Sequence, residues 1–378
     1  MPASSRVAFA NTLRGVAALC VVVFHHGYVF WNLRAVTAQL INAPPLPSPP
    51  DVPLYLRWLP YLQPFDLGQF GVGLFFLISG FVIPFSFATT TRRGFAVGRL
   101  TRIYPTFMVA FACTALFVWL SSRHFGRAFP HGTATVAWQF LPGFHDMALT
   151  PTIDAIIWTL NIEMKFYLVC LLMAPWFARG SVRVFVAPVI LTALALFLPT
   201  AADTRGFWLI VAIMFIDLMF VGVAFNYFTR GWLSRKGMAI AVAGSCAGMA
   251  IPWIHEPVLR PVSAWSYAAA LAVFVLAFLL RHSRLFQPTR VTEFFADISY
   301  PLYLVHGVIG YVLLRILLDF GWPASLALAT TTTSVIGFAW LLHVVLEMPS
   351  HAWGKRVASR WRKRADAPAL SAAASSAE

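Results

Sequence analysis

The chain of 378 residues is too apolar for a soluble protein: 59% of its residues are hydrophobic, 11% are charged, and the mean hydropathy is +0.73. Soluble domains carry about a quarter charged residues and just under half apolar ones. Disorder is excluded too, because disordered chains are poor in apolar and aromatic residues. The net charge of +14 comes from basic residues in short breaks between apolar runs. This placement favours a membrane-topology signal over a nucleic-acid surface.

Ten apolar segments of helical length follow one another along the chain. A membrane span needs about 20 apolar residues, and lipid requires every backbone polar group to be paired within its own helix. The sequence therefore predicts an all-α, polytopic membrane protein with about ten transmembrane helices. The segments are residues 8–31, 70–90, 102–120, 154–177, 182–198, 207–227, 237–254, 262–280, 299–318 and 323–346.

The basic residues predict the orientation of these spans. With the N-terminus inside, 20 of the 28 Lys and Arg residues fall on one side of the membrane and six on the other. Because basic loops remain in the cytoplasm, we expect both termini to be cytoplasmic. The expected domains are a transmembrane domain over residues 1–355 and a cytoplasmic tail over 356–378. This tail is basic, then rich in Ala and Ser, and is predicted to be disordered.

The positions of the cysteines and the spacing of possible motifs limit the kinds of site that the sequence predicts. The four cysteines lie inside apolar segments without CxxC spacing, which favours buried hydrophobes over disulfides or a metal site. The first apolar run ends in His25-His26 without a small-residue cleavage site, so it is expected to remain as a span. Without metal-ligand spacing or a phosphate-cradling glycine loop, no metal ion and no nucleotide hydrolysis are expected.

Ionisable residues inside spans are the first candidates for a site, because each costs a few kcal/mol or more in lipid. Arg14 and His25 are eleven positions apart, about three helical turns, and therefore share a face. His26 points about 100° away from that face. Glu163 enters its span from the opposite side, at a depth compatible with that of His25. The others of this kind are Asp217, His306, His343 and Glu347.

These residues also have structural explanations. A single histidine in a span is often a packed, hydrogen-bonded residue, and Glu163 can serve as an interhelical polar contact. The basic cluster Arg92, Arg93, Arg99 and Arg102 is accounted for by topology alone.

Taken together, six motifs in order along the chain resemble those of acyltransferase family 3, a family of membrane O-acyltransferases. They are residues 11–26 (NTLRGVAALCVVVFHH), 71–81 (GVGLFFLISGF), 99–105 (RLTRIYP), 158–167 (WTLNIEMKFY), 298–306 (ISYPLYLVH) and 347–349 (EMP). Gly73 stands where many members have an acidic residue, and Met164-Lys165 stand where Glu-Gln is common. The resemblance therefore implies no charge-dependent role for Gly73 or for Met164-Lys165.

The resemblance implies transfer of an acyl group, expected to be acetyl, from cytoplasmic acyl-CoA to a hydroxyl of a cell-surface glycan or similar acceptor. The expected location is the inner membrane of a bacterium. Imidazole, with an ordinary pKa near 6.5, suits a general base. The resemblance implies that His25 and Glu163 are catalytic, and direct attack and an acyl-histidine intermediate both remain open. The residues expected to bind acyl-CoA are Arg14, Arg99, Arg102, Arg92 and Arg93, and further motif residues are Ser79, Tyr303, His306 and Glu347.

The alternative class is a membrane transporter or flippase for a lipid-linked or small polar substrate, since charges inside spans also mark substrate and proton paths. That class predicts inverted repeats and paired broken helices, and the sequence shows neither. A structural scaffold would leave Arg14, His25 and Glu163 unexplained.

Overall fold

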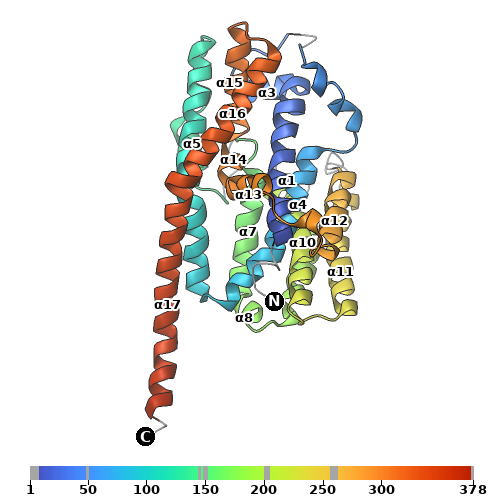
Figure 1. Ribbon diagram of the computed structural model, residues 1–378, viewed down its shortest axis with the longest axis vertical. Coiled ribbons are helices and arrows are strands. Elements are labelled where there is room, and N and C mark those ends of the chain that lie inside the picture. The colour runs from blue at the N-terminus through green and yellow to red at the C-terminus, as the bar shows by residue number, and fades with distance from the viewer. Residues whose placement is uncertain are drawn as a thin grey trace.

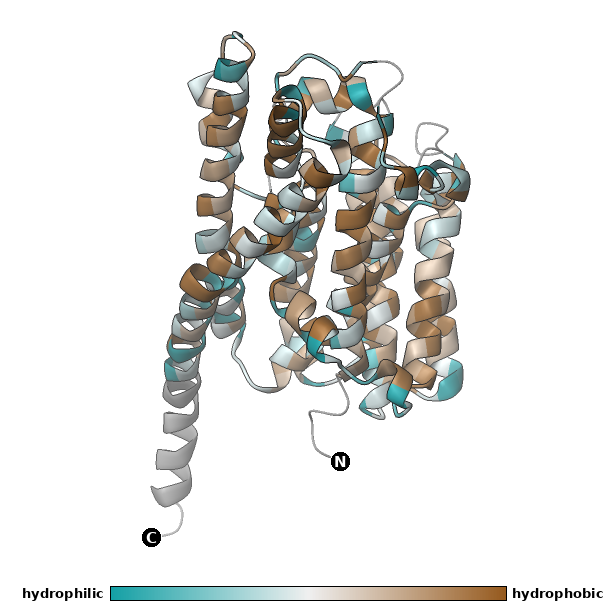
Figure 2. Ribbon diagram, turned by 45° about the horizontal axis from the view of Figure 1, so that its top comes forward, coloured by the Kyte–Doolittle hydropathy of each residue, from teal (hydrophilic) through white to brown (hydrophobic). Residues whose placement is uncertain are grey.

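The computed structural model describes residues 8–47, 51–143, 146–147, 152–199, 205–255 and 263–375, with side chains through Trp361. These residues form a helical bundle, and the described ranges contain no strand (Figure 1). The predicted all-α class is confirmed. Hydrophobic residues follow the lengths of the helices and hydrophilic ones gather toward their ends (Figure 2), as expected of a bundle that spans a membrane.

The first half of the chain supplies the helices that carry most of the predicted motifs. They are α1 (Ala8–Phe24), the π-helical turn η1 (His25–Val29), α2 (Phe30–Asn32), α3 (Arg34–Leu40), η2 (Leu54–Leu56), η3 (Leu59–Leu62), α4 (Leu67–Val82), η4 (Ile83–Ala88), α5 (Arg92–His124), α6 (Thr133–Gln139), α7 (Trp158–Leu172) and α8 (Ala174–Ala178).

The second half contains the most deeply buried helix and the long C-terminal one. Its helices are η5 (Val182–Phe185), α9 (Val186–Ala195), α10 (Arg205–Thr229), α11 (Arg235–His255), α12 (Ala264–Leu279), η7 (Arg284–Phe286), α13 (Arg290–Asp297), α14 (Ser299–Val305), α15 (Val308–Asp319), α16 (Ala324–Leu342), the π-helical turn η8 (His343–Glu347) and α17 (Met348–Ser375).

Each of the ten apolar segments coincides with one helix or a short run of helices. Six helices in the described ranges are long and apolar enough to cross a membrane, and the number is seven if α14 and α15, bent by 53°, form one span. Helices α9 and α12 are apolar but shorter. The number of ten spans and the cytoplasmic placement of both termini stay predictions.

Helices α4 and α10 form the centre of the bundle. Every residue of α10 from Ile210 to Tyr227 is buried. The two helices approach backbone to backbone, because a Cβ at Gly80 would collide with the carbonyl oxygen of Met219 and a Cβ at Gly222 with that of Leu77. Small residues that allow such close approach are typical of helix pairs in membranes.

Several helices begin at a side-chain cap that their sequence supplies. The Asp66 carboxylate accepts a hydrogen bond from the Gln69 N–H at the start of α4, and the Thr91 hydroxyl accepts one from the Gly94 N–H at the start of α5. Such caps satisfy backbone donors that have no partner within the first turn. They fix where α4 and α5 begin, and both helices carry residues of the candidate site.

Helix α17 packs lengthwise on α5 and extends beyond the rest of the bundle, at the lower end of Figure 1. A Cβ at Gly354 would collide with the Thr101 hydroxyl, and one at Gly94 would lie 3.3 Å from the Cβ of Ala358. These small residues set the position of α17 against α5. The predicted boundary between residues 355 and 356 falls inside this helix, and the division into domain and tail remains a prediction.

Candidate active site

The π-helical turn η1 presents two adjacent histidines at the end of α1. Turns of this kind contain one extra residue per turn and often occur at functional sites. The Nδ1 atom of His25 contacts the hydroxyl of Tyr311 on α15. Its ring lies edge-on to that of His306, with 4.8 Å between the ring centroids. His25 is thus held between two residues of the late part of the chain.

His26 is engaged differently and is buried. Its Nε2 lies 2.8 Å from the carbonyl oxygen of His306, and its Nδ1 lies 3.0 Å from the Thr332 hydroxyl. Because a carbonyl only accepts, Nε2 carries the proton and Nδ1 of the neutral ring accepts from Thr332. Both nitrogens of His26 are occupied, so this histidine joins α1 to α14 and α16. These contacts favour a structural role for His26.

His306 is fully buried, and its two ring nitrogens differ in their surroundings. Its Nδ1–H donates to the carbonyl oxygens of Leu302 and Tyr303, at 3.0 and 2.9 Å. The proton is therefore fixed on Nδ1, and Nε2 carries a lone pair. That Nε2 has no hydrogen-bond partner within the described part of the chain. A neutral imidazole with a free lone pair thus lies beside the His25 ring.

Arg14 and Glu163 share a cavity of about 80 Å³ in the interior of the bundle. Arg102, Ser79 and Tyr303 also line it. Oε1 of Glu163 accepts a hydrogen bond of 2.5 Å from the Tyr167 hydroxyl. The carboxylates of Glu163 and Glu347 attract the Arg14 guanidinium, and Arg102 repels it. Two cations, Arg14 and Arg102, and one carboxylate, Glu163, therefore line this cavity.

Glu163 and His25 do not form a contacting pair, although their predicted depths in the membrane are compatible. His25 contacts Tyr311, Glu163 contacts Tyr167, and the described residues show no contact between His25 and Glu163. The reason is that Arg14 lies nearly three turns before His25, and Glu163 lies at the level of Arg14. Between Arg14 and His306, the residues Ala18, Val21 and Leu302 line a seam with no room for a water molecule.

A larger cavity, of about 400 Å³, opens where η4, α5 and α17 meet. Arg99, Arg102 and Lys355 supply its cations, and Arg102 also lines the Arg14 cavity. Nη2 of Arg99 donates to the Ser86 hydroxyl at 2.9 Å. We call this space the basic cleft. Arg92 and Arg93, also predicted to bind the donor, are exposed in the first turn of α5 and do not line it.

The remaining motif residues are held by local polar contacts. The Tyr303 hydroxyl donates to the Ile156 carbonyl at 2.7 Å and accepts from Thr159 at 2.5 Å. Glu347 Oε2 lies 2.8 Å from Nδ1 of His343 across the turn η8. Described Cys, His, Asp and Glu side chains form no group of three that would hold a metal ion.

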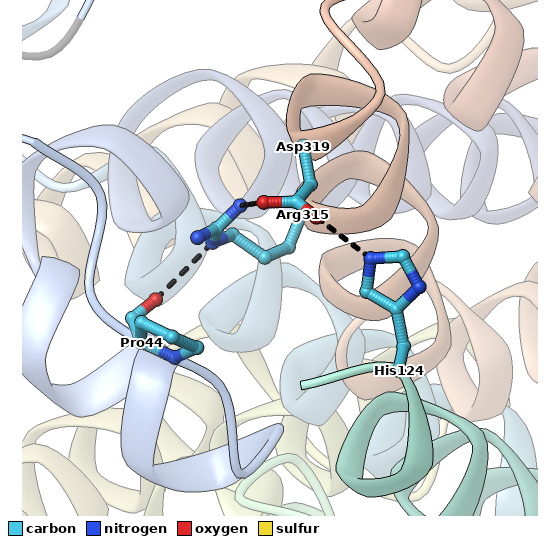
Figure 3. A network of polar contacts seen from close by, with 4 residues as sticks. All are labelled: Pro44, His124, Arg315 and Asp319. Atoms are coloured by element: carbon cyan, nitrogen blue, oxygen red, sulfur yellow. Dashed lines mark hydrogen bonds and ion pairs between the residues drawn. The ribbon is translucent and has the colours of Figure 1, made fainter. Parts of the chain in front are cut away.

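A separate polar network lies at the end of the bundle where α5 and α15 terminate (Figure 3). Nε of Arg315 donates to the Pro44 carbonyl at 3.1 Å, and its Nη1 lies 3.4 Å from Asp319. Asp319 in turn lies 2.8 Å from Nε2 of His124. The network ties the segment after α3 to α5 and α15, and it pairs Arg315, which lies within the predicted span 299–318.

Two neighbours of the histidines escaped the sequence analysis. Tyr311 is an uncharged residue in an apolar run, so nothing in its pattern marks it. Asp154 precedes α7, is buried, and accepts a hydrogen bond of 3.1 Å from the Ile156 N–H. Its carboxylate interacts electrostatically with the hydroxyls of Tyr303 and Tyr311. The available signal was an acidic residue at the first position of the predicted span 154–177.

Comparison with protein families gives one match that covers most of the chain. A family model described as an acyltransferase domain matches residues 7–344. This range includes His25, Arg14, Glu163, His306 and the cations of α5, and it ends before α17. Comparisons with curated proteins and with solved structures give no significant match.

Proposed function

The chain belongs to acyltransferase family 3, and is thus an acyltransferase with several membrane helices. We propose that it transfers an acyl group from a donor bound at one end of an internal route to an acceptor bound at the other end. The donor is acyl-CoA, bound at the basic cleft, and the acceptor is a hydroxyl that reaches His25. The acyl group is acetyl, the acceptor is a cell-surface glycan or a similar molecule, and the location is the bacterial inner membrane.

The order of the cavities supports this proposal. Arg102 lines both the basic cleft and the Arg14 cavity, and the seam beyond that cavity ends at His306. A molecule with phosphates at one end and a thioester at the other fits such a route, because guanidinium groups bind phosphate in a planar, bidentate manner. The seam must open by side-chain movement for the thioester to reach His25.

Proton transfer at His25 follows from its contacts. When Nδ1–H donates to the Tyr311 oxygen, Nε2 has a free lone pair and takes the proton of the acceptor hydroxyl. The hydroxyl oxygen attacks the thioester carbonyl carbon, the carbon–sulfur bond breaks, and the CoA thiolate takes the proton back from the imidazolium. Tyr311 fixes the orientation of the ring, and the free Nε2 of His306 provides a second proton acceptor beside it. An acyl-histidine intermediate fits the same arrangement.

The observation that carries the proposal is that neighbouring spaces share lining residues. Arg102 lines both the basic cleft and the Arg14 cavity, and Tyr303 lines both that cavity and the closed seam that reaches His306, beside His25. A transporter would be favoured by paired broken helices, whereas the described residues contain one bent pair, α14 and α15.

The experiment that tests the proposal supplies acetyl-labelled acetyl-CoA to membranes that contain the protein. We expect label in the surface-glycan fraction that mild base releases as acetate, as an O-ester requires. Label that stays in acetyl-CoA, or that enters only base-stable products, would contradict the proposal.

A further inference from the structure

The C-terminal helix α17 forms one wall of the basic cleft, although it lies outside the part of the chain that the family model matches. The close approach of Gly354 to Thr101 and of Gly94 to Ala358 holds α17 against α5. As a result His351, Lys355 and Ser359, which follow one another at helical spacing of four, face Arg99 and Arg102 across the cleft. This wall is therefore fixed by packing.

The side chains around the basic cleft are suited to an anion. Its cations are Arg99, Arg102 and Lys355, and the described lining residues contain no carboxylate. The Arg99 guanidinium is already oriented, because it donates to Ser86 and lies 5.3 Å from the ring centroid of Tyr167. Cations gathered without a counter-charge repel one another, so an anionic ligand that bridges them is stabilised.

We propose that α17 completes the donor site by binding the 3′-phosphorylated nucleotide end of CoA, with Lys355 and His351 opposite Arg99 and Arg102. The inference rests on the proposed acyl-CoA donor and adds the region of the chain that recognises the nucleotide. A volume of about 400 Å³ lies within the range of small-molecule sites. The Arg14 cavity, of about 80 Å³, is too small for a nucleotide.

The same phosphate chemistry has a second source, the headgroup of an anionic phospholipid at the cytoplasmic surface. The two sources differ in a testable way, because only CoA combines its phosphates with a nucleotide. Adenosine 3′,5′-bisphosphate is the soluble probe for the CoA source. Detergent-solubilised protein mixed with phosphatidylglycerol-containing nanodiscs tests the lipid source.

The test compares Lys355→Ala with Arg356→Ala in the full-length protein. Both changes remove one positive charge from an exposed position of α17, but Arg356 does not line the cleft. Binding of adenosine 3′,5′-bisphosphate is measured by calorimetry, and KM is measured for acetyl-CoA and for 3′-dephospho-acetyl-CoA. We expect Lys355→Ala to weaken bisphosphate binding about tenfold, as loss of a charge-assisted phosphate contact implies. The ratio of the two KM values should fall toward one in Lys355→Ala and stay at its original value in Arg356→Ala.

Three outcomes overturn this inference. They are equal losses in the two variants, an unchanged KM ratio in Lys355→Ala, and competition by phosphatidylglycerol without any binding of the bisphosphate. Its failure is distinguishable from failure of the proposed function, because bisphosphate binding needs no transfer reaction. Acetyl transfer that is insensitive to Lys355→Ala would support the proposed function and contradict the nucleotide site on α17. Bisphosphate binding that depends on Lys355, without any acetyl transfer, would support the site on α17 and contradict the proposed function.

Discussion

The Nδ1 atom of His25 contacts the hydroxyl of Tyr311, a residue 286 positions later in the chain. The contact joins the end of α1 to the first half of α15 and occupies Nδ1 of the imidazole, so that Nε2 is the nitrogen that takes the proton in the proposed mechanism. A carboxylate has this orienting role in serine hydrolase triads. In the proposed mechanism a neutral phenol takes this role, which avoids burying an additional charge in the bundle.

Tyr311→Phe keeps the ring and removes the hydroxyl. We expect kcat to fall about tenfold or more, because His25 loses the contact that selects its tautomer and orientation. Folding should change little, since the packing of the ring is retained. Steady-state transfer rates per folded protein check this, with Tyr61→Phe as the control because Tyr61 is 86% exposed. A fully active Tyr311→Phe enzyme would show that the contact has no catalytic role.

His26→Ala should destabilise the protein and leave the activity of each folded molecule largely intact. Its removal leaves the His306 carbonyl and the Thr332 hydroxyl without their partner, which costs about 1–3 kcal/mol. Thermal unfolding in detergent, followed by activity per folded protein, separates the two effects. A stable variant that has lost transfer would move the catalytic role from His25 to His26.

Glu163→Gln should act on the donor step, because Glu163 lies with Arg14 and Tyr167 and away from His25. Loss of the charge that attracts the Arg14 guanidinium should raise KM for acetyl-CoA by about tenfold. The measurement is a KM and kcat comparison with wild type. A fall in kcat at unchanged KM would restore the sequence-based pairing of Glu163 with His25.

Arg102→Ala should raise KM for acetyl-CoA by about ten- to a hundredfold, the usual effect of losing a charge-assisted phosphate contact. Arg102→Lys should recover part of the loss, since lysine keeps the charge and lacks the planar fork. Arg179→Ala is the control, because Arg179 is exposed on the same predicted side of the membrane and does not line the basic cleft. Equal KM values in Arg102→Ala and wild type would show that Arg102 does not bind the donor and contributes only to membrane topology.

Asp66→Asn tests a pH effect at the start of α4. Burial raises the pKa of the Asp66 carboxyl, while hydrogen bonds from Gln69 and Gly68 limit the rise. The folded protein therefore holds more protons at this site than the unfolded chain does. Stability should fall as the pH rises from the unfolded pKa, near 3.9, through the raised folded value. Asparagine remains a good N-cap and does not titrate.

We expect the unfolding temperature of Asp66→Asn to increase relative to that of wild type as the pH rises from 4 toward 7. Thermal unfolding in detergent at several pH values measures this. Asp51→Asn is the control, because Asp51 is exposed in the segment before η2. A difference between Asp66→Asn and wild type that does not change with pH would contradict the assignment of the raised pKa.

The sequence predicts the helical class, because helical spacing and the cost of charges in lipid are local properties. The shared face of Arg14 and His25 stays a prediction. It does not predict the turn η1 at His25–His26, since an extra residue in a turn arises from packing against α14 and α15. The prediction that Glu163 pairs with His25 depended on how deep each helix lies relative to the other. The positions of loops in the sequence do not determine these relative depths. Tyr311 and α17 were missed because an uncharged phenol and a basic helix after the last span have no distinctive pattern.

The most direct test of the central claim is transfer of labelled acetyl from acetyl-CoA by His25→Ala, compared with His26→Ala at equal amounts of folded protein. Our account predicts that His25→Ala still binds acetyl-CoA but loses transfer by a factor of about 10² or more, and that His26→Ala retains most of its specific activity. Near-normal transfer by His25→Ala together with an inactive, well-folded His26→Ala would contradict the account.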